Sequence, residues 1–400
     1  MKQGWEIKKF SDVVWFQEGP GVRKHQYTSE GIKLINVANL VNGVVDLSTS
    51  DRYISIEEAY GKYKHFLVDE GDLILASSGI QVEYIEKKMG FIHKEHLPLC
   101  MNTSTIRFKA LNRTTLDMTF FMYYLKSFDF KIQLKKLITG IAQLNFGPSH
   151  LKQMSIPIPP FPEQEKIVAE LDCLSGVIEK KKQQLKELDS LAESIFYTMF
   201  GDPITNEKGW KIIPLSNKVK VKGRVGWKGY KKEDLRDSGP LAIGGGHLTD
   251  NGGIDISNPV YLSIEKYLES PEIMIEVGDI ILVQRGTIGK VGLIANSIGE
   301  ATINPCVLIL RPDNLSSVYL LHFFLNASTQ MHLKTLIKGV AQPMITQQQV
   351  NELSLPIPPL TLQQEFAEKI EAIEKQKELI KESIIQTEEL FNSRMDYYFG

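Results

Sequence analysis

The 400-residue chain repeats part of itself at one constant offset of 199 residues. Three short motifs recur at this offset, namely Gly140-Ile141-Ala142-Gln143 as Gly339-Val340-Ala341-Gln342, Pro157-Ile158-Pro159-Pro160 as Pro356-Ile357-Pro358-Pro359, and Phe200-Gly201 as Phe399-Gly400. Residues 140–201 therefore align with residues 339–400 without a gap, and 15 of the 62 aligned positions are identical. A repeat of this length predicts two copies of one structural unit in the chain.

The sequence upstream of each repeated segment is related more loosely. Matching pairs include Gly4-Trp5 with Gly209-Trp210, Tyr53 with Tyr261, and Gly71-Asp72-Leu73-Ile74-Leu75 with Gly278-Asp279-Ile280-Ile281-Leu282. The offsets of these pairs drift from 205 to 208 residues, so the upstream parts have diverged. Each half thus consists of a variable head followed by a better-kept tail. Shared tails indicate a common structural role, whereas diverged heads indicate different ligands.

Each tail has the apolar spacing of a long helix that follows an extended Pro-Ile-Pro-Pro segment. In the first tail the apolar heptad positions are Leu171, Leu174, Ile178, Leu185, Leu188, Ala192, Ile195 and Met199, and Lys181 interrupts them. The second tail has Ile370, Ile373, Lys377, Ile380, Ile384, Thr387, Phe391, Arg394 and Tyr398 at these positions. Gly201 and Pro203 are typical of a helix end. We expect two helices of about 38 residues, roughly 57 Å long each.

A long helix with one apolar stripe needs a partner that covers the stripe. We expect the two tail helices to pair with each other as an antiparallel coiled coil, related by a pseudo-twofold axis. Pairing with another protein or with a second copy of the chain is the alternative. Lys181 and Lys377, which interrupt the heptads, are interpreted either as docking positions for a partner or as surface lysines that extend into solvent.

The heads alternate short β-type runs with turn residues, which predicts a mixed α+β domain in each half. The predicted elements are strands at 66–68, 73–75, 273–276 and 280–283 and short helices at 120–126 and 319–325.

Patterns typical of catalysis are missing from the sequence. Residues 284–291 resemble a phosphate loop but lack its first glycine and its Ser/Thr. Ile158 and Ile357 stand where an amino-methyltransferase needs a polar residue before Pro-Pro-aromatic, and no glycine-rich cofactor loop precedes either. No Ser/His/Asp order or zinc-type spacing stands out among the eight histidines. We therefore predict that the chain is not an enzyme.

The charge distribution is more informative than the total. The formal net charge of -2 does not by itself favour a nucleic-acid binder. The tails (163–200 and 361–400) contain seven more acidic than basic residues, however, so the rest of the chain carries a net charge of +5. Nine Lys/Arg and two acidic residues lie within 211–236, with Trp227 and Tyr230 among them. This composition suits DNA phosphate contacts; a solvated face of an edge strand is the alternative.

The turn after Gly-Asp-Ile-Ile-Leu is a second candidate for DNA contact. Gln284 and Arg285 carry the bidentate groups that read adenine and guanine edges in the major groove. The first head has Ser77-Ser78-Gly79 at this place, so the two heads would read different bases; a purely structural turn is the alternative. The candidate DNA-binding residues are Arg23, Lys24, His25, Ser77, Ser78, Gln81, Lys222, Arg224, Lys228, Gln284, Arg285, Thr287 and Lys290.

The sequence lacks the segments that would place the protein in a membrane or direct it to secretion. The sequence contains no run of about 18 apolar residues that could span a membrane. Its start, MKQGWEIKKF, has no apolar stretch typical of a secretory signal. Cys100, Cys173 and Cys306 lie too far apart in the sequence for a disulfide framework or a zinc motif. We expect a cytoplasmic protein.

Over its whole length the pattern of head, helix, head and helix resembles the specificity subunit of type I restriction–modification systems. The motifs that carry the resemblance are Gly-x-Ala-Gln, Pro-Ile-Pro-Pro, Pro162-Glu163-Gln164-Glu165-Lys166-Ile167, and Gly278 to Gly292 followed by Asn304. The first head departs from the family in having Ser-Gly-Ile-Gln-Val where Gly-Thr-Ile-Gly-Lys is expected, and the second tail departs in having Thr361-Leu362-Gln363-Gln364.

The resemblance implies two target-recognition domains, at 1–155 and 207–354, and two helical spacers, at 156–206 and 355–400. Each domain would read one half of a split, asymmetric double-stranded DNA site, and the paired helices would set the unread spacer. Two methylation subunits that bind S-adenosylmethionine and restriction subunits that use ATP and Mg²⁺ would be the partners, and this chain would hold no cofactor. The alternatives are a specificity module of a related system without a motor, a two-headed scaffold for protein or carbohydrate, and a self-contained methyltransferase.

Overall fold

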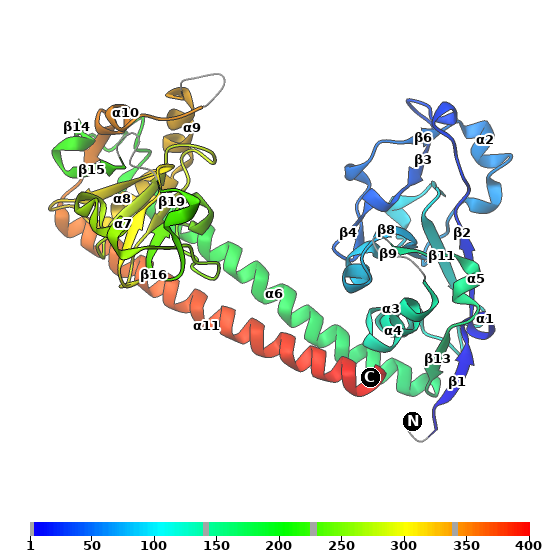
Figure 1. The fold of residues 1–400 in the computed structure, drawn as a ribbon. Helices are drawn as coiled ribbons and strands as arrows, with labels where there is room; N and C mark the ends of the chain where they lie inside the picture. The colour runs from blue at the N-terminus through cyan, green and yellow to red at the C-terminus, as the bar shows by residue number, and fades with distance from the viewer. Residues whose placement is uncertain (1–3, 139–143, 225–229, 338–342) are drawn as a thin grey trace. The chain divides into compact units, whose positions relative to one another are not determined.

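A computed structural model describes residues 4–138, 144–224, 230–337 and 343–400. The two Gly-x-Ala-Gln motifs, Trp227 and Lys228 lie outside the described residues. The chain forms two compact units, unit 1 of Met1–Lys180 with Ile384–Gly400, and unit 2 of Lys181–Ser383 (Figure 1). Each unit therefore contains one head together with a segment of both long helices.

Unit 1 contains short helices, 3-10 turns and small sheets. Its strands are β1 (Glu6–Lys9), β2 (Val14–Glu18), β3 (Ile32–Ile35), β4 (Leu40–Val41), β5 (Val44–Val45), β6 (Tyr53–Ile54), β7 (Leu73–Ala76), β8 (Ser78–Ile80), β9 (Met89–Phe91), β10 (Leu99–Met101), β11 (Thr105–Ala110), β12 (Leu144–Asn145) and β13 (Ser155–Ile158). Its shorter helices are α1 (Phe10–Val13), α2 (Ile56–Tyr60), α3 (Met118–Lys126), α4 (Phe128–Leu137) and α5 (Pro148–Leu151). Its 3-10 turns are η1 (Lys24–Gln26), η2 (Val37–Asn39), η3 (Leu47–Thr49), η4 (Lys64–Phe66), η5 (Val82–Lys88) and η6 (Lys94–His96).

Unit 2 repeats this plan with fewer elements. Its strands are β14 (Lys211–Pro214), β15 (Val219–Gly223), β16 (Leu235–Ile243), β17 (Tyr261–Leu262), β18 (Ile280–Val283), β19 (Val291–Leu293), β20 (Ala301–Ile303), β21 (Val307–Pro312) and β22 (Ser354–Ile357). Its shorter helices are α7 (Ile264–Leu268), α8 (Ser317–Leu325), α9 (Ala327–Thr335) and α10 (Gln347–Asn351). Its 3-10 turns are η7 (Leu215–Asn217), η8 (Lys232–Asp234), η9 (Gly245–His247) and η10 (Pro271–Ile273).

The strand orders of the larger sheets correspond between the two units. The four-stranded sheet has the order β2-β11-β7-β9 in unit 1 and β15-β21-β18-β19 in unit 2. The three-stranded sheet has the order β10-β3-β6 in unit 1 and β17-β16-β20, read in reverse, in unit 2. Each Pro-Ile-Pro-Pro segment begins in an extended strand, since β13 pairs with β1 and β22 pairs with β14. The predicted internal repeat and the α+β class are therefore confirmed.

The long helices α6 (Phe161–Phe200) and α11 (Leu360–Phe399) run antiparallel. In unit 1 the Arg394 guanidinium donates to the Glu170 carboxylate at 2.9 Å. In unit 2 the Lys377 ammonium lies 2.7 Å from the Asp189 carboxylate. The partner on α11 thus moves toward the start of that helix as the residue on α6 moves toward its end. This order confirms the predicted antiparallel pairing within the chain.

The two lysines that interrupt the heptads take part in this pairing. Lys377 is 3% exposed and binds Asp189 and, at 2.6 Å, Glu374. Lys181 donates to the Ser383 hydroxyl at 2.5 Å. The interpretation as a solvent-exposed lysine was therefore wrong for Lys377, whereas Lys181 is half-buried and binds the facing helix. The interpretation as docking positions stays a prediction. A lysine can occupy an apolar seam when acceptors on the facing helix satisfy its ammonium group.

The last residue of each long helix is an aromatic anchor. The ring of Phe399 lies 5.3 Å from that of Phe120 in unit 1, and the ring of Phe200 lies 4.8 Å from that of Tyr319 in unit 2. Both phenylalanines are 2% exposed. Gly201 follows the first helix with a φ of 75°, which confirms the predicted glycine stop because this left-handed geometry favours glycine.

One glutamine in each tail fixes the start of the long helix. The Gln164 amide donates to the Pro159 carbonyl at 2.9 Å, and the Gln363 amide donates to the Pro358 carbonyl at 2.9 Å. Both side chains are buried, at 0% and 2% exposure. The second tail departs from the family at Thr361-Leu362 but keeps the glutamine that makes this contact.

Two strand predictions were wrong. Residue 66 is the last residue of η4 and residue 273 the last of η10, and the residues that follow form only isolated bridges, at Leu67 and Met274. The reason is that an arginine on an inner strand, β11 or β21, binds a carbonyl that a strand at this place would use. In the first head Arg107 donates to the Leu67 carbonyl at 2.6 Å. In the second head Arg311, its counterpart, donates to the Met274 carbonyl at 2.9 Å. The other predicted strands and short helices are confirmed as β7, β18, α3 and α8.

Candidate nucleic-acid interface

The Gly-Asp motif of each head sets the direction of the strand that leads to the candidate loop. Asp72 accepts a hydrogen bond from Arg107 at 3.4 Å, and Asp279 accepts one from Arg311 at 2.7 Å. Burial raises the pKa of Asp72, and the hydrogen bond to Asp279 raises the pKa of Arg311. The glycine before each aspartate has a positive φ, 83° and 93°. The motif is therefore structural, and it positions β7 and β18.

In the second head, the loop after β18 buries one of its two predicted base-reading side chains and exposes the other. Gln284 is 8% exposed, and its amide donates to the Pro305 carbonyl at 3.0 Å. Arg285 is exposed, although its backbone N–H donates to the Cys306 carbonyl and its backbone bridges to Met344. The Gln284 amide thus holds the loop in place, and the Arg285 side chain projects from it.

The rest of this loop is a tight turn. Gly286 and Gly289 have φ values of 88° and 89°, a conformation that side chains rarely adopt. Thr287 is exposed at the tip of the turn. The ammonium group of Lys290 lies 2.8 Å from the carboxylate of Asp250, which is 97% exposed. Screening by solvent makes such a pair weak, so Lys290 can exchange Asp250 for another anion.

A small cavity lies behind the Arg285 loop. It has a volume of about 210 Å³ and is lined by Gly223, Arg224, Gln284, Arg285, Pro305, Leu308 and Gln347. Arg224 is buried, and its guanidinium donates to the Ile303 carbonyl at 3.1 Å and the Thr302 hydroxyl at 3.4 Å. Burial lowers the pKa of Arg224. Arg224 therefore supports the second head from inside rather than extending from its surface.

Lys222, another basic candidate of this head, lies on β15. This strand is at the edge of the four-stranded sheet, with Lys220 exposed and Lys222 half-buried. An edge strand with alternating lysines is the alternative that the sequence left open, and such a strand also leaves its ammonium groups accessible to phosphates. Lys228, another candidate, lies outside the described residues.

The first head places a different set of side chains after its Gly-Asp strand. Ser77 is 1% exposed, and its hydroxyl has no hydrogen-bond partner among the described residues. Ser78 is half-buried, and its strand β8 pairs with Asn145 of β12. Gln81 is exposed at the start of η5. Of these three candidates only Gln81 has a fully exposed side chain.

The remaining candidates of the first head lie on another segment. Arg23, Lys24 and His25 are exposed at η1. The next residue, Gln26, donates to the Glu58 carboxylate at 2.8 Å and so fixes η1 beside α2. These residues therefore belong to the α2 side of the head, whereas Ser77 to Gln81 follow β7, an inner strand of the four-stranded sheet.

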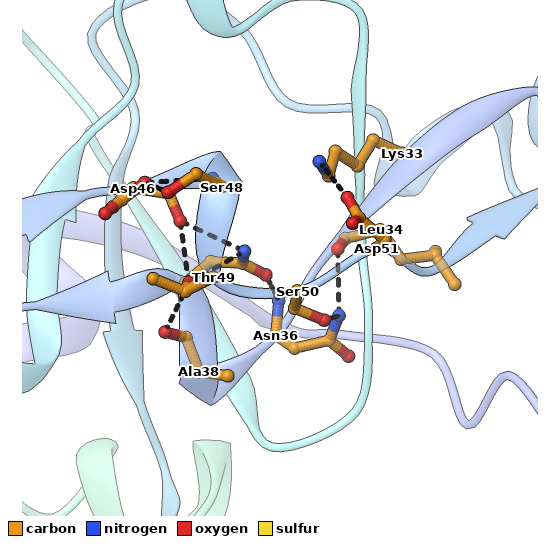
Figure 2. A network of polar contacts seen from close by, with 10 residues as sticks. Lys33, Leu34, Asn36, Ala38, Asp46, Ser48, Thr49, Ser50 and Asp51 are labelled. Carbon is orange, nitrogen blue, oxygen red and sulfur yellow. Dashed lines mark hydrogen bonds and ion pairs between the residues drawn. The ribbon is translucent and has the colours of Figure 1, made fainter. Parts of the chain in front are cut away.

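A buried amide network was missed by sequence reasoning. Figure 2 shows part of it, where Asn36 donates to the Leu34 carbonyl at 2.9 Å and lies 3.5 Å from the Ser50 hydroxyl. Asn102 donates to the Asn36 side chain at 2.6 Å, and Asn39 accepts from the Asn36 backbone at 2.9 Å. This network joins the turn after β3 to the turn after β10 and makes both rigid.

The second head contains the same turn with other residues. There the His247 ring accepts from the Gly244 backbone at 3.0 Å. A second contact recurs downstream of this turn in both heads. In the first head Asp46 accepts from the Ser48 backbone at 2.9 Å, and in the second head Asp255 accepts from the Ser257 backbone at 2.9 Å. The repeated Asp-x-Ser was the available signal, and hydrogen bonds to serine lower the pKa of both aspartates.

Two absences hold for the described part of the chain. None of its helices is long and apolar enough to cross a membrane. Nor do three or more of its His, Cys, Asp and Glu side chains gather where they could hold a metal ion.

Known proteins are similar to this chain in sequence and in fold. The sequence profile of the family described as type I restriction modification DNA specificity domain matches residues 2–190 and 225–389. The MjaVIII specificity subunit of a type I restriction enzyme of Methanocaldococcus jannaschii is 24% identical over 193 residues, which are 48% of this chain and 44% of that protein. The chain thus spans less than half the length of that relative.

Two other comparisons cover nearly the whole chain. The MjaX specificity subunit of the same organism is 22% identical over 412 residues, covering 95% of this chain and 91% of that protein. A chain solved in work on complex assembly and conformational transition of the type I R-M system has the same fold, with a TM-score of 0.60, 17% identity and coverage of 100% and 98%. Since the family profile matches both halves, this chain belongs to the type I restriction–modification DNA specificity domain family.

Proposed function

We propose that this chain is the DNA sequence-specificity subunit of a type I restriction–modification complex. Each head reads one half of a bipartite, asymmetric site in the major groove. The observation that carries the proposal is a common scaffold with different loops. Both heads have the same strand orders and the same Gly-Asp turn, but the loop is 77–88 in one and 284–290 in the other. One scaffold with two loops suits two readers of different bases.

The residues of the second head take distinct roles in this proposal. Arg285 is exposed at the loop tip and suits bidentate recognition of a guanine edge. Gln284 is a positioning residue, because its amide is held by the Pro305 carbonyl. Lys220 and Lys222 on the edge strand contact phosphates and contribute affinity without sequence preference.

The paired helices act as the spacer between the half-sites and as the docking surface for two methylation subunits. Leu191 and Leu390 occupy the same position in the two repeats and are 46% and 50% exposed. The same exposed leucine on both helices suits two copies of one partner. The restriction subunits join the same assembly.

The chemistry of the complex resides on the partners. The methylation subunits bind S-adenosylmethionine, and the restriction subunits use ATP and Mg²⁺. This chain acts in the cytoplasm, positions those subunits on DNA and performs no catalysis.

The exchange of one head tests the proposal. Residues 1–155 are replaced with the corresponding head of another family member, and the chain is co-expressed with its methylation subunit. Methylome sequencing of the host is expected to show one changed half-site and one unchanged half-site, because each head reads its half independently. A change in both half-sites would contradict modular reading. Absence of any chain-dependent methylated motif would instead support a scaffold for protein or carbohydrate.

A further inference from the structure

The two heads differ in the segment that joins the last two strands of the four-stranded sheet, β7 and β9 in the first head and β18 and β19 in the second. In the second head β18 and β19 are joined by the tight turn 284–290, which carries Arg285. In the first head β7 and β9 are joined by the longer segment 77–88, which contains β8 and the 3-10 turn η5. The candidates that match Arg285 in position, Ser77 and Ser78, are buried and half-buried. The first head therefore needs other side chains for DNA contact.

The η5 segment is firmly anchored to the first head. Val82 and Ile85 are 6% and 0% exposed and belong to the hydrophobic core. Lys131 donates to the Glu83 carbonyl at 3.1 Å, and Lys88 donates to the Leu40 carbonyl at 2.9 Å. The segment is thus held by hydrogen bonds near both of its ends and by two side chains buried in the core.

Two outward side chains of η5 form an exposed aromatic–cation pair. The Tyr84 ring is 53% exposed, and the ammonium group of Lys87 lies 4.9 Å from its centroid. The acidic side chains of the same turn are occupied by other lysines, since Glu83 lies 2.5 Å from Lys135 and Glu86 lies 2.9 Å from Lys131. The Tyr84–Lys87 pair therefore faces solvent while the nearby carboxylates are neutralised.

We propose that Tyr84 and Lys87 form the DNA contact of the first head that takes the place of Arg285 in the second. The Tyr84 ring packs against a base edge in the major groove, such as a thymine methyl group, and Lys87 binds the adjacent phosphate. A ring on an anchored turn loses little conformational freedom on binding. This inference rests on the proposed function of the chain.

The test uses the full chain purified with its methylation subunit and a duplex carrying its methylated motif. Tyr84→Ala is expected to weaken binding by about tenfold and to relax discrimination at one position of the first half-site only. Tyr84→Phe keeps the ring and is expected to retain most of the affinity. Tyr60→Ala is the matched control, because Tyr60 is 51% exposed in the same head.

Lys87→Ala is expected to weaken binding to all sequences alike and to reduce the salt dependence of binding by about one counterion. Lys62→Ala is its control, since Lys62 lies 5.0 Å from the centroid of the Tyr63 ring in the same head. Equal affinities for Tyr84→Ala and the unaltered complex, while Arg285→Ala still reduces discrimination at one base pair of the other half-site, would overturn the inference and leave the proposed function standing. If the unaltered complex does not prefer its motif over a scrambled duplex, the proposed function itself fails.

Discussion

Lys377 of α11 lies 2.7 Å from Asp189 of α6, and only 3% of the lysine is exposed. The pair joins two helices whose interacting residues are 188 positions apart in the sequence. At the equivalent position of the first repeat the residue is Ile178, so the polar contact breaks the internal symmetry. A buried ammonium group of this kind is costly without its acceptor.

Asp189→Ala is expected to lower the free energy of unfolding by about 1–3 kcal/mol, because the buried Lys377 ammonium group loses one of its carboxylate partners. Lys377→Met is expected to change stability by less than about 1 kcal/mol, since an apolar side chain suits the seam. Urea unfolding of the full chain measures both, with the exposed Glu193→Ala as control. Equal destabilisation by Asp189→Ala and Glu193→Ala would show that the contact is unimportant.

The His322 side chain gives a pH dependence of known sign. Burial, with a smaller effect of the nearby Lys377, lowers the pKa of His322 to about 4. The unfolded chain therefore takes up a proton that the folded chain does not bind as pH falls below about 6.5. Stability should decrease between about pH 6.5 and 4 and then level off.

His322→Tyr, which copies Tyr123 at the equivalent position of the first repeat, should flatten this part of the stability profile. The measurement is the difference in unfolding free energy between the variant and the unaltered chain at pH 7.5, 6.0 and 5.0. Parallel profiles of the two chains would contradict a neutral, half-buried His322 in the folded chain.

Truncation of Arg285 and truncation of Lys222 should change DNA binding in different ways. Arg285→Ala is expected to reduce discrimination at one base pair by about 1–3 kcal/mol, because a bidentate donor is lost. Lys222→Ala is expected to weaken binding to every sequence alike. Competition binding with single-base variants of the motif distinguishes them, and Arg285→Lys keeps the charge but not the paired donors. The reverse pattern would show that the two roles are exchanged.

Shortening both helices tests their role as a spacer. Deletion of residues 173–179 and 385–391 removes one heptad from facing parts of α6 and α11 and spares the contacts at Lys181 and Lys377. Seven helical residues span about 10.5 Å, which corresponds to about three base pairs. The methylated motif should therefore keep both half-sites and lose about three unread base pairs. An unchanged spacer would show that the helices do not measure distance.

Sequence reasoning succeeded where the pattern is local or repeated. The offset of 199 residues predicted two equivalent units, and the heptads with Gly201 predicted the long helices and the end of the first. It failed at residues 66–68, because the side chain of Arg107 on β11 binds the Leu67 carbonyl that a strand would have used.

For the candidate interface, the sequence by itself determined which segments carry basic and bidentate side chains. The tertiary structure alone decided that Gln284 and Arg224 turn inward, that Arg285 and Tyr84 remain exposed, and that Lys377 is buried. The physical reason is that exposure of a polar side chain depends on acceptors supplied by residues far away in the sequence. Apolar spacing marks the face that a helix buries, but it does not reveal which carbonyl or carboxylate lies opposite.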